Sequence, residues 1–372
     1  MKALGIILAG GNNNKMHELS NKRAIAAMPV GGSYRCIDFA LSNMSNSHIQ
    51  RVAVLTQYNA RSLNEHLSSS KWWDFGRKQG GLYVFTPTLT ADNGFWYRGT
   101  ADAIYQNIDF LKRSHEPYVI IAAGDCVYKL DYNKVLDYHI KKKADITIVC
   151  KDMPEDMDVS RFGVLCMNEE SRIVEFEEKP MVAHSHTIST GIYVLRRRQL
   201  IEMLEKCAEE ERHDLVNDVL IRYKNMKRIY GYKIDTYWSN IATVDSYYNT
   251  NMDFLKPEVR NFFYKQEPAI YSKIDDLAPA KYNVGANVHN SLVSSGCIIN
   301  GTVENSMLFK QVFVGKDCVI KNSIILNDVY IGDNTHIENC IVESHDTIRA
   351  NTYLSGEDGI KIVLEQNERY IM

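Results

Sequence analysis

The chain has 372 residues, with 43 Lys and Arg against 46 Asp and Glu, so its formal net charge is −3. This length predicts two or three domains, and a composition that is 45% hydrophobic and 24% charged excludes a largely disordered protein. The near-neutral charge argues against a nucleic-acid partner, and the longest apolar runs are too short for the ~20 residues of a membrane span.

The N-terminal residues lead directly into a strand-like segment, Leu4–Ala9, with no cleavage site and no separate apolar leader. This pattern predicts a cytoplasmic protein. The eight cysteines are scattered, and no two are spaced as Cys-x-x-Cys. We therefore expect reduced, mostly buried thiols and no zinc site.

The first two-thirds of the chain alternates strand and helix patterns. Four short apolar runs are typical of buried parallel strands: Leu4–Ala9, Arg51–Thr56, Tyr118–Ala123 and Ala144–Cys150. Between them, Thr100–Arg113 places its apolar residues on one face of a helix. The alternation predicts an α/β domain over residues 1–255, with ligands bound beyond the carboxyl ends of the strands.

After about Leu255 the pattern changes, and three prolines punctuate a segment, 256–280, that we interpret as a connector. Residues 281–372 repeat a short motif. Val288–Val293 recurs as Val303–Leu308, Ile320–Ile325 and Ile337–Val342, in steps of 15, 17 and 17 residues. Such repeats predict a β-solenoid with aliphatic side chains inside and Asn at the corners, although a β-sandwich with accidental similarity is an alternative.

The first strand ends in Gly10-Gly11, a turn whose backbone N–H groups can approach a phosphate. Further segments make the pattern specific: Pro29–Phe39, Leu41–Asn43, Trp96–Ala103, Ala123–Lys129, Phe176–Pro180 and Thr190–Tyr193. With these motifs, in this order over nearly the whole chain, the sequence resembles the glucose-1-phosphate adenylyltransferase (ADP-glucose pyrophosphorylase) family of bacterial glycogen synthesis.

This resemblance implies a Rossmann-like, mixed but mostly parallel nucleotidyltransferase domain, followed by a C-terminal left-handed parallel β-helix. It also implies a tetramer, and the conversion of ATP and glucose 1-phosphate to ADP-glucose and pyrophosphate. Such a transfer depends on positioning and on neutralisation of phosphate charge by Mg²⁺ and cationic side chains.

On the nucleotide side the sequence departs from the family. The resemblance places nucleotide binding at Leu8, Ala9, Gly10, Gly11 and Lys15. The family's Gly-Gly-x-Gly-Thr-Arg-Leu loop is replaced here by Gly10–Met16, in which Lys15 stands for the arginine and an asparagine, Asn13, for the third glycine. A lysine keeps the charge but loses the bidentate fork.

Two further nucleotide-side positions are altered. The lysine of the family's Arg-Ala-Lys-Pro-Ala motif is replaced by Ile25, which cannot neutralise a phosphate. The family's adenine-reading Pro-Ala-Gln-Gln has no glutamine counterpart in Thr86–Thr90, where Leu89 stands. Both changes predict weak ATP chemistry.

The family holds its metal with two aspartates. The first matches Asp125, and the second, in a Tyr-Trp-x-Asp-x-Gly-Thr motif, is Asn240 here. An amide carries no charge, so Asp125 is the one catalytic and metal-binding residue that remains. Lys15, Ile25 and Asn240 stand at other catalytic positions of the family, and the site is therefore degenerate. Active family members use Mg²⁺, but we expect this chain to require no cofactor.

The sugar-phosphate side is better kept. The positions that match family sugar-phosphate residues are Tyr97, Glu178, Lys179, Ser189, Gly191, Asp214 and Trp238. Leu215 replaces the usual phenylalanine, which puts sugar stacking in doubt. A pocket of this kind could bind a sugar phosphate as an effector without turnover, and support of the fold is the competing reason for these residues.

The simultaneous changes predict a regulatory, largely non-catalytic, allosteric subunit, similar to the second subunit type of Gram-positive bacteria. Its expected partner is a catalytic subunit, in a hetero-tetramer built through the α/β domain and the solenoid. Two alternatives stay open: a genuine but slow sugar-phosphate nucleotidyltransferase, and a stand-alone sugar-phosphate sensor. Arg196–Arg198 reads as a solvated face or, alternatively, an allosteric anion site, and Trp72-Trp73 as buried packing or a subunit contact.

Overall fold

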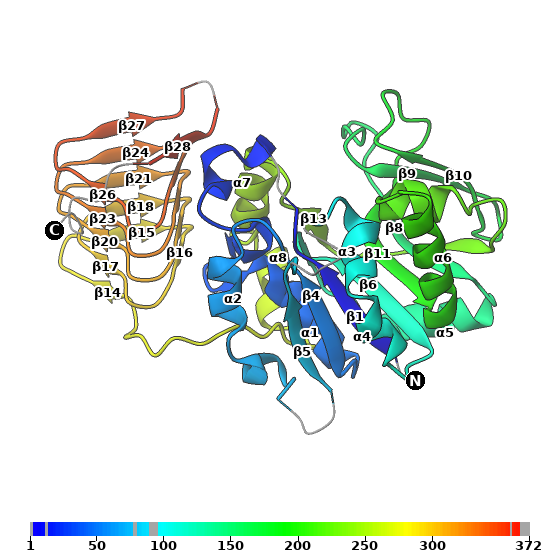
Figure 1. Ribbon diagram of the computed structural model, residues 1–372. Coiled ribbons are helices and arrows are strands. Elements are labelled where there is room, and N and C mark those ends of the chain that lie inside the picture. Colours follow the sequence, from blue (N-terminus) through cyan, green and yellow to red (C-terminus); the bar gives the residue numbers. More distant parts are fainter. Residues whose placement is uncertain (1–2, 12–13, 77–79, 89–95, 358, 365–372) are drawn as a thin grey trace.

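The computed structural model describes residues 3–11, 14–76, 80–88, 96–357 and 359–364. An α/β domain and a parallel β-helix lie side by side, and helices α7 (Val244–Asp253) and α8 (Pro257–Tyr264) lie between the central sheet and the β-helix (Figure 1). This arrangement confirms the predicted fold class.

The sheet of the α/β domain is mixed, with a parallel centre. Strands β6, β1, β4 and β5 are parallel, while β11 is antiparallel to both of its long neighbours, β6 and β8. The strands are, in order across the sheet, β10 (Ile173–Glu178), β9 (Gly163–Met167), β11 (Thr187–Arg196), β6 (Tyr118–Ala123), β1 (Ala3–Leu8), β4 (Arg51–Leu55) and β5 (Gly81–Phe85), with β8 (Ile146–Asp152) on β11 and β12 (Ile229–Lys233) on β8. All four predicted strands are present, within a few residues at their ends.

Helices cover both faces of this sheet. Apolar residues of α1 (Cys36–Asn46), α2 (Arg61–Leu67) and α5 (Tyr132–Lys141) form one core with alternate residues of β1, and those of α3 (Thr100–Gln106), α4 (Ile108–Lys112) and α6 (Arg197–Glu209) form the other. The remaining elements are short: η1 (Asn14–Ser20), η2 (Ile25–Ala27), η3 (Ser70–Trp73), η4 (Val216–Ile221), β2 (Pro29–Val30), β3 (Tyr34–Arg35), β7 (Cys126–Tyr128) and β13 (Trp238–Asn240).

The single helix expected over Thr100–Arg113 is wrong, because the structure divides it into α3 and α4 at Asn107. The Asn107 Nδ2 donates to the Ala103 carbonyl and to the Tyr97 hydroxyl, both at 2.9 Å. An asparagine side chain that binds local groups in this way competes with the helical pattern. The first residue of α3, Thr100, lies at the edge of the candidate site.

The β-helix consists of three five-stranded parallel sheets, and it is left-handed. Their strands are β14 (Lys281–Tyr282), β17 (Ile298–Ile299), β20 (Phe313–Val314), β23 (Tyr330–Ile331) and β26 (Thr347–Ile348); β15 (Asn287–His289), β18 (Thr302–Glu304), β21 (Val319–Lys321), β24 (His336–Glu338) and β27 (Tyr353–Ser355); and β16 (Leu292–Val293), β19 (Met307–Leu308), β22 (Ile324–Ile325), β25 (Cys340–Val342) and β28 (Lys361–Val363). The register pairs the repeats as predicted, from Val288 through Val303 and Ile320 to Ile337.

Asparagines turn the corners of the β-helix, as the repeats predict. Asn290, Asn305, Asn322 and Asn339 follow equivalent strands, and all have a φ between 43° and 52°. Asparagine tolerates this left-handed conformation better than most residues. The Asn290 Nδ2 donates to Asn305 Oδ1 at 2.9 Å, and the Asn305 Nδ2 donates to Asn322 Oδ1 at 2.7 Å, so successive coils are also joined by side chains.

One sheet of the β-helix packs against the α/β domain. Its Met307, Ile324 and Ile341 lie in one apolar cluster with Met16 and Phe263 of the rest of the chain. The alternate residues of the same strands face the interior of the β-helix. The two units therefore share a continuous core, which fixes the β-helix next to the segment that follows β1.

The segment 256–280 is more than a linker. It begins with α8, which has Pro257 in its first turn, where proline is favoured. The Phe263 ring is buried among Phe39, Phe254 and Tyr237, at centroid distances of 5.1 to 5.4 Å. The prolines thus mark a connector whose first half is folded into the interdomain core.

The structure gives the surroundings of the cysteines, Trp73 and Arg197. All eight thiols are free. Trp73 is buried, and its Nε1 donates to the Tyr271 carbonyl at 3.0 Å, in agreement with buried packing. Arg197 donates to the Glu116 and Leu111 carbonyls, so the centre of the Arg196–Arg198 run has a structural role.

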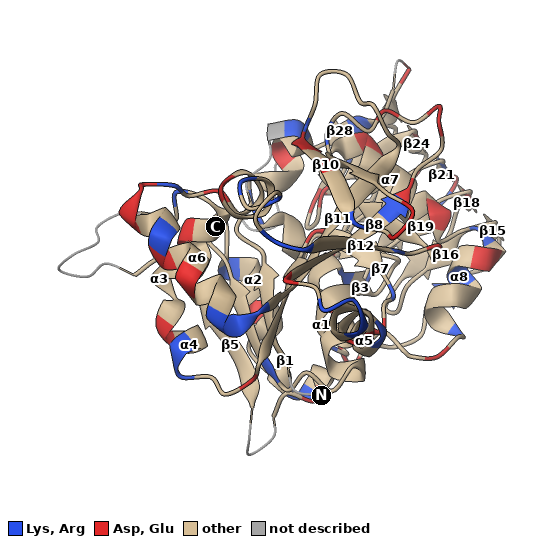
Figure 2. Ribbon diagram, turned by 90° about the vertical axis from the view of Figure 1, so that its right-hand side faces the viewer, with Lys and Arg blue, Asp and Glu red and all other residues tan. Residues whose placement is uncertain are grey.

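Lys and Arg are interspersed with Asp and Glu over the ribbon (Figure 2). No helix within the described ranges has the length and apolar character to cross a membrane.

A buried histidine makes stability depend on pH. His139 of α5 contacts Thr147 Oγ1 through Nδ1 at 2.8 Å, and burial, together with the charge of Arg196, lowers its pKa to about 4. The unfolded imidazole, in contrast, takes up a proton near its ordinary pKa of 6.5. We therefore expect the free energy of unfolding to fall by roughly 3 kcal/mol as the pH decreases from about 7 to about 4.

Urea unfolding of the unaltered chain and of His139→Gln at both pH values measures this contribution. Glutamine does not titrate, so the difference between the two pH values should be smaller in the variant by that amount. An equal difference in both proteins would show that His139 is not the group responsible.

Candidate functional site

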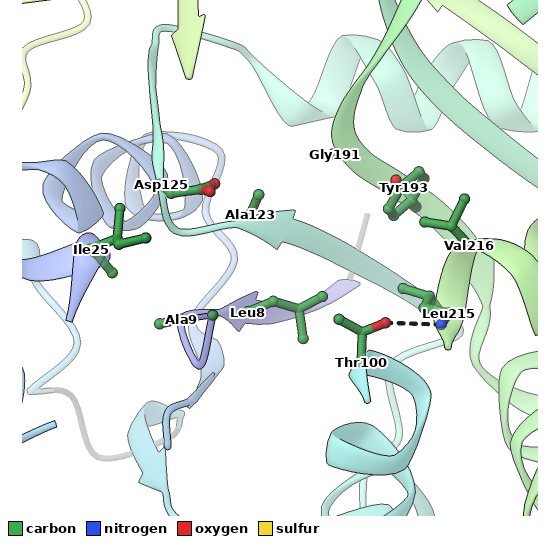
Figure 3. A pocket seen from close by; sticks show the side chains of 12 residues that line it. Leu8, Ala9, Ile25, Thr100, Ala123, Asp125, Gly191, Tyr193, Leu215 and Val216 are labelled. Carbon is green, nitrogen blue, oxygen red and sulfur yellow. Dashed lines mark hydrogen bonds between the residues drawn. The ribbon is translucent and has the colours of Figure 1, made fainter. Parts of the chain in front are cut away.

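The candidate site lies at the carboxyl ends of β1, β4 and β6, where the α/β pattern places a ligand. Two cavities adjoin there, of about 230 and 270 Å³, and both are lined by Leu8, Gly11 and Thr100. The Thr100 Oγ1 accepts a hydrogen bond from the Leu215 N–H at 2.8 Å, which closes the wall between α3 and the segment before η4 (Figure 3). Together the cavities form one cleft.

The first cavity is mostly apolar. Its lining residues are Leu8, Ala9, Gly11, Ile25, Ala26, Thr100, Ala123, Asp125, Gly191, Tyr193, Leu215 and Val216. The Asp125 carboxylate projects from the loop after β6, with Ile25 on the neighbouring wall (Figure 3). No Lys or Arg is among these residues, so the described part of the cavity wall offers an anion no cationic side chain.

The predicted nucleotide turn borders both cavities. Leu8 and Gly11 line the two of them, Ala9 the first and Gly10 the second. Lys15, by contrast, is exposed and lines neither. Hydrogen bonds from Ser160, together with the charges of Arg161 and Lys15, lower the pKa of the Asp158 carboxyl. Lys15 therefore lies near the segment before β9. Asn12, Asn13 and Leu89 lie outside the described residues.

Ile25 belongs to the wall of the cleft and to the core at once. Only 6% of it is exposed, in the short helix η2. It lines the first cavity, and it is also a member of the apolar cluster that contains Met307, Ile324 and Ile341 of the β-helix. The position at which the family carries a phosphate-binding lysine is therefore an apolar packing position here.

Asp125 and Asn240 lie on adjacent segments. Strands β7 and β13 are antiparallel and pair Asn240 with Cys126, the residue after Asp125. The Asn240 Nδ2 donates to the Asp125 carbonyl at 3.4 Å and contacts Cys126 Sγ at 3.6 Å. Burial raises the pKa of the Asp125 carboxyl, and hydrogen bonds from Asn240 and Cys126 offset part of this rise.

This pair does not fit a magnesium site. Mg²⁺ in nucleotidyltransferases is usually held by carboxylates and phosphate oxygens. Asp125 supplies one carboxylate, and the Asn240 amide, whose Nδ2 donates to the Asp125 backbone carbonyl, supplies no second charge. No group of three or more His, Cys, Asp or Glu side chains suited to a metal is found in the described ranges. One carboxylate beside a neutral amide lacks the charge that a site for Mg²⁺ needs.

The predicted sugar-phosphate residues are only partly brought together. Gly191 lines the first cavity and Tyr97 the second. Gly191 has a φ of 76°, and a Cβ there would lie 3.0 Å from the Ala123 Cβ, so glycine is required at this approach. The Ser189 Oγ donates to the Tyr193 hydroxyl at 3.3 Å, at the wall of the first cavity.

The other four predicted residues line neither cavity: Glu178, Lys179, Asp214 and Trp238. Lys179 Nζ lies 3.5 Å from Glu178 Oε1, and burial raises the pKa of the Glu178 carboxyl. The Asp214 carboxylate accepts the Asn217 N–H at 2.7 Å, in the first turn of η4. Trp238 packs edge-to-face on Phe162. Asp214 thus has a structural hydrogen bond and Trp238 a packing contact, while the buried Trp238 Nε1 has no hydrogen-bond partner among the described residues.

Several residues in and beside the cleft were not predicted from the sequence. Gln57 and Tyr58, which follow β4, line the second cavity, and Gln57 Oε1 accepts the Tyr97 N–H at 2.7 Å. Their position after a predicted strand was the available signal. Arg161, which donates to the Thr243 Oγ1 at 3.4 Å, places a half-buried cation against the turn that follows Asn240. Nothing in the local sequence indicates that contact.

Comparison with known proteins divides the chain at the same place as the structure. A family described as "Nucleotidyl transferase" matches residues 4–257, and one described as "GlmU-like, C-terminal hexapeptide" matches residues 278–360. A glucose-1-phosphate adenylyltransferase of Thermosipho melanesiensis is 39% identical over 320 residues, 86% of this chain and 77% of the relative. One of Clostridium perfringens is 41% identical over 322 residues (86% and 81%), and one of Clostridium botulinum is 42% identical over 369 residues (98% and 95%).

Proposed function

This chain belongs to the glucose-1-phosphate adenylyltransferase family, and from that premise we propose that it is a regulatory, largely non-catalytic subunit of such an enzyme. The family reaction, between ATP and glucose 1-phosphate, would take place in a catalytic partner. This chain would bias the conformation of that partner through a coupling free energy between the subunits.

One observation carries the proposal: the described wall of the first cavity has no cationic side chain, and the Arg98 guanidinium at the second cavity pairs with Asp102 at 3.3 Å. Ile25 replaces a cation and packs into the interdomain core, and Asn240 replaces a metal carboxylate and donates to Asp125. Removal of a single electrostatic stabiliser typically costs ~10²–10³ in rate. Such losses need not multiply, but both oppose binding of a metal triphosphate.

The intact scaffold supports a role within an assembly. Each of the three sheets of the β-helix has five strands within the described residues, and its docking on the α/β domain buries an extensive apolar cluster. A chain that has lost active-site charges but retains this architecture is suited to pair with a homologous catalytic subunit, in a hetero-tetramer. A sugar phosphate is the proposed effector class.

A mixing assay tests this proposal. The isolated chain should form ADP-glucose at least ~10²-fold more slowly than a motif-complete catalytic subunit. When it is mixed with a motif-complete catalytic subunit from the same cells, it should co-purify with that subunit and shift the effector concentration for half-maximal response by about 5–150-fold. The catalytic subunit alone, at equal total protein, is the control.

Two outcomes would reject the proposal in different ways. Turnover by the isolated chain that is comparable with that of the catalytic subunit would favour a genuine nucleotidyltransferase. Retention of Asp125 and of a charge at Lys15 is the observation in favour of that second candidate. Binding of glucose 1-phosphate by the isolated chain, without association with the catalytic subunit, would favour a stand-alone sensor.

A further inference from the structure

An ion pair at the interdomain boundary links the β-helix to the cleft wall. Arg23 lies between η1 and η2, and its Nη2 donates to Oε1 of Glu343, the residue after β25. The Glu343 side chain is 0% exposed and that of Arg23 is 13% exposed. The two side chains are 320 positions apart in the chain.

The surroundings make this pair costly to separate. The Ser344 N–H donates to the same Glu343 oxygen at 2.6 Å, whereas Glu343 Oε2 has no partner among the described residues. Arg23 also lies near Arg35, whose pKa is lowered by burial and by the charge of Arg23. If one charge of a buried pair is removed, the other is left desolvated and uncompensated. Glu343 is therefore the counter-charge on which the buried position of Arg23 depends.

Arg23 is also close to the cleft along the chain. Two residues later Ile25 lines the first cavity, and Ala26 lines it as well. The Ala24 N–H donates to the Asn59 carbonyl at 3.2 Å, and Ala27 and Met28 close short turns on Ala24 and Ile25. The segment 23–27 therefore touches the β-helix on one side and forms part of the cleft wall on the other.

We propose that Glu343 and Arg23 are positioning residues of the cleft: the β-helix, through Glu343, fixes the segment 23–27 and thereby the place of Ile25 in the cavity wall. This inference concerns the chain by itself and does not depend on the proposed function. In this proposal the β-helix helps to set the geometry of the cavity wall, because a shift of the β-helix changes the position of Arg23 and therefore that of Ile25.

Hydrogen–deuterium exchange of the full chain tests this directly. In Glu343→Gln, which keeps the shape and removes the charge, amides of residues 19–30 should exchange at least about tenfold faster than in the unaltered chain. Glu304→Gln is the matched control, because Glu304 pairs with Lys321 at 3.3 Å on the outer face of the β-helix, with about half of its side chain exposed. It should leave residues 19–30 unchanged.

Variants at Arg23 distinguish positioning from general support. Arg23→Gln should accelerate the same amides, and Arg23→Lys, which keeps the charge, should restore most of their protection. The double variant R23Q/E343Q should be no worse than E343Q alone, because it leaves no orphan charge. If E343Q does not fold, the Arg23 variants carry the test. Unchanged exchange at residues 19–30, or acceleration spread evenly over the chain, would overturn the proposal.

Discussion

The double variant I25K/N240D is expected to form ADP-glucose at least ~10²-fold faster than the unaltered chain. The lysine introduced in place of Ile25 would project into the first cavity, where no cationic side chain lines the described wall. The carboxylate introduced in place of Asn240 would stand beside Asp125, where the unaltered chain has a neutral hydrogen-bond donor. Two neighbouring carboxylates repel unless a cation lies between them, so the change also favours metal binding. Steady-state assays with saturating Mg²⁺, ATP and glucose 1-phosphate measure the gain.

Matched variants control for mere changes of shape. Ile25→Met and Asn240→Ala alter the same positions without adding charge, and neither should raise the rate. The single variant Asn240→Asp should be less stable than the unaltered chain without metal and should recover stability when Mg²⁺ is added. A double variant no faster than the unaltered chain would show that the charges missing at these two positions do not limit the rate.

Phe263→Ala should lower the free energy of unfolding by about 3–5 kcal/mol, the usual cost of truncating a large buried side chain. The ring is 1% exposed and lies 5.1 Å from Phe254 and 5.3 Å from Phe39. Its cluster also contains residues of the β-helix, so the cavity would open at the boundary of the two domains. Urea unfolding followed by fluorescence measures this loss.

Glu258→Ala provides the control for that experiment, since Glu258 is exposed on the same helix, α8. Its effect should stay within about 0.5 kcal/mol. A similarly small effect of Phe263→Ala would mean that α8 is not anchored in the interdomain core.

The β-helix could be predicted from the local sequence because the same pattern of residues recurs in successive coils. The inward aliphatics recur at equivalent positions, and an asparagine stands at each equivalent corner where the chain needs a positive φ. The four apolar runs of the α/β domain likewise indicated strands. The antiparallel insertion of β11 between β6 and β8 could not be foreseen, since strand direction within a sheet is set by connections over long distances.

The candidate site, too, could be predicted from the sequence only in part. The positions of Gly11, Asp125 and Gly191 around one cavity followed from the motifs. The structural contacts of Asp214 and Trp238, and the packing of Ile25 against the β-helix, depend on residues far away in the chain. The pairing of Arg23 with Glu343 spans 320 positions, and no local pattern of charge marks either residue.

Calorimetric titration of Mg-ATP into the isolated chain tests the central claim, that the cleft cannot hold a metal triphosphate. The account predicts a dissociation constant weaker than on the order of 1 mM, unaffected by removal of Mg²⁺. A dissociation constant in the micromolar range, lost without Mg²⁺ and in Asp125→Ala, would contradict it.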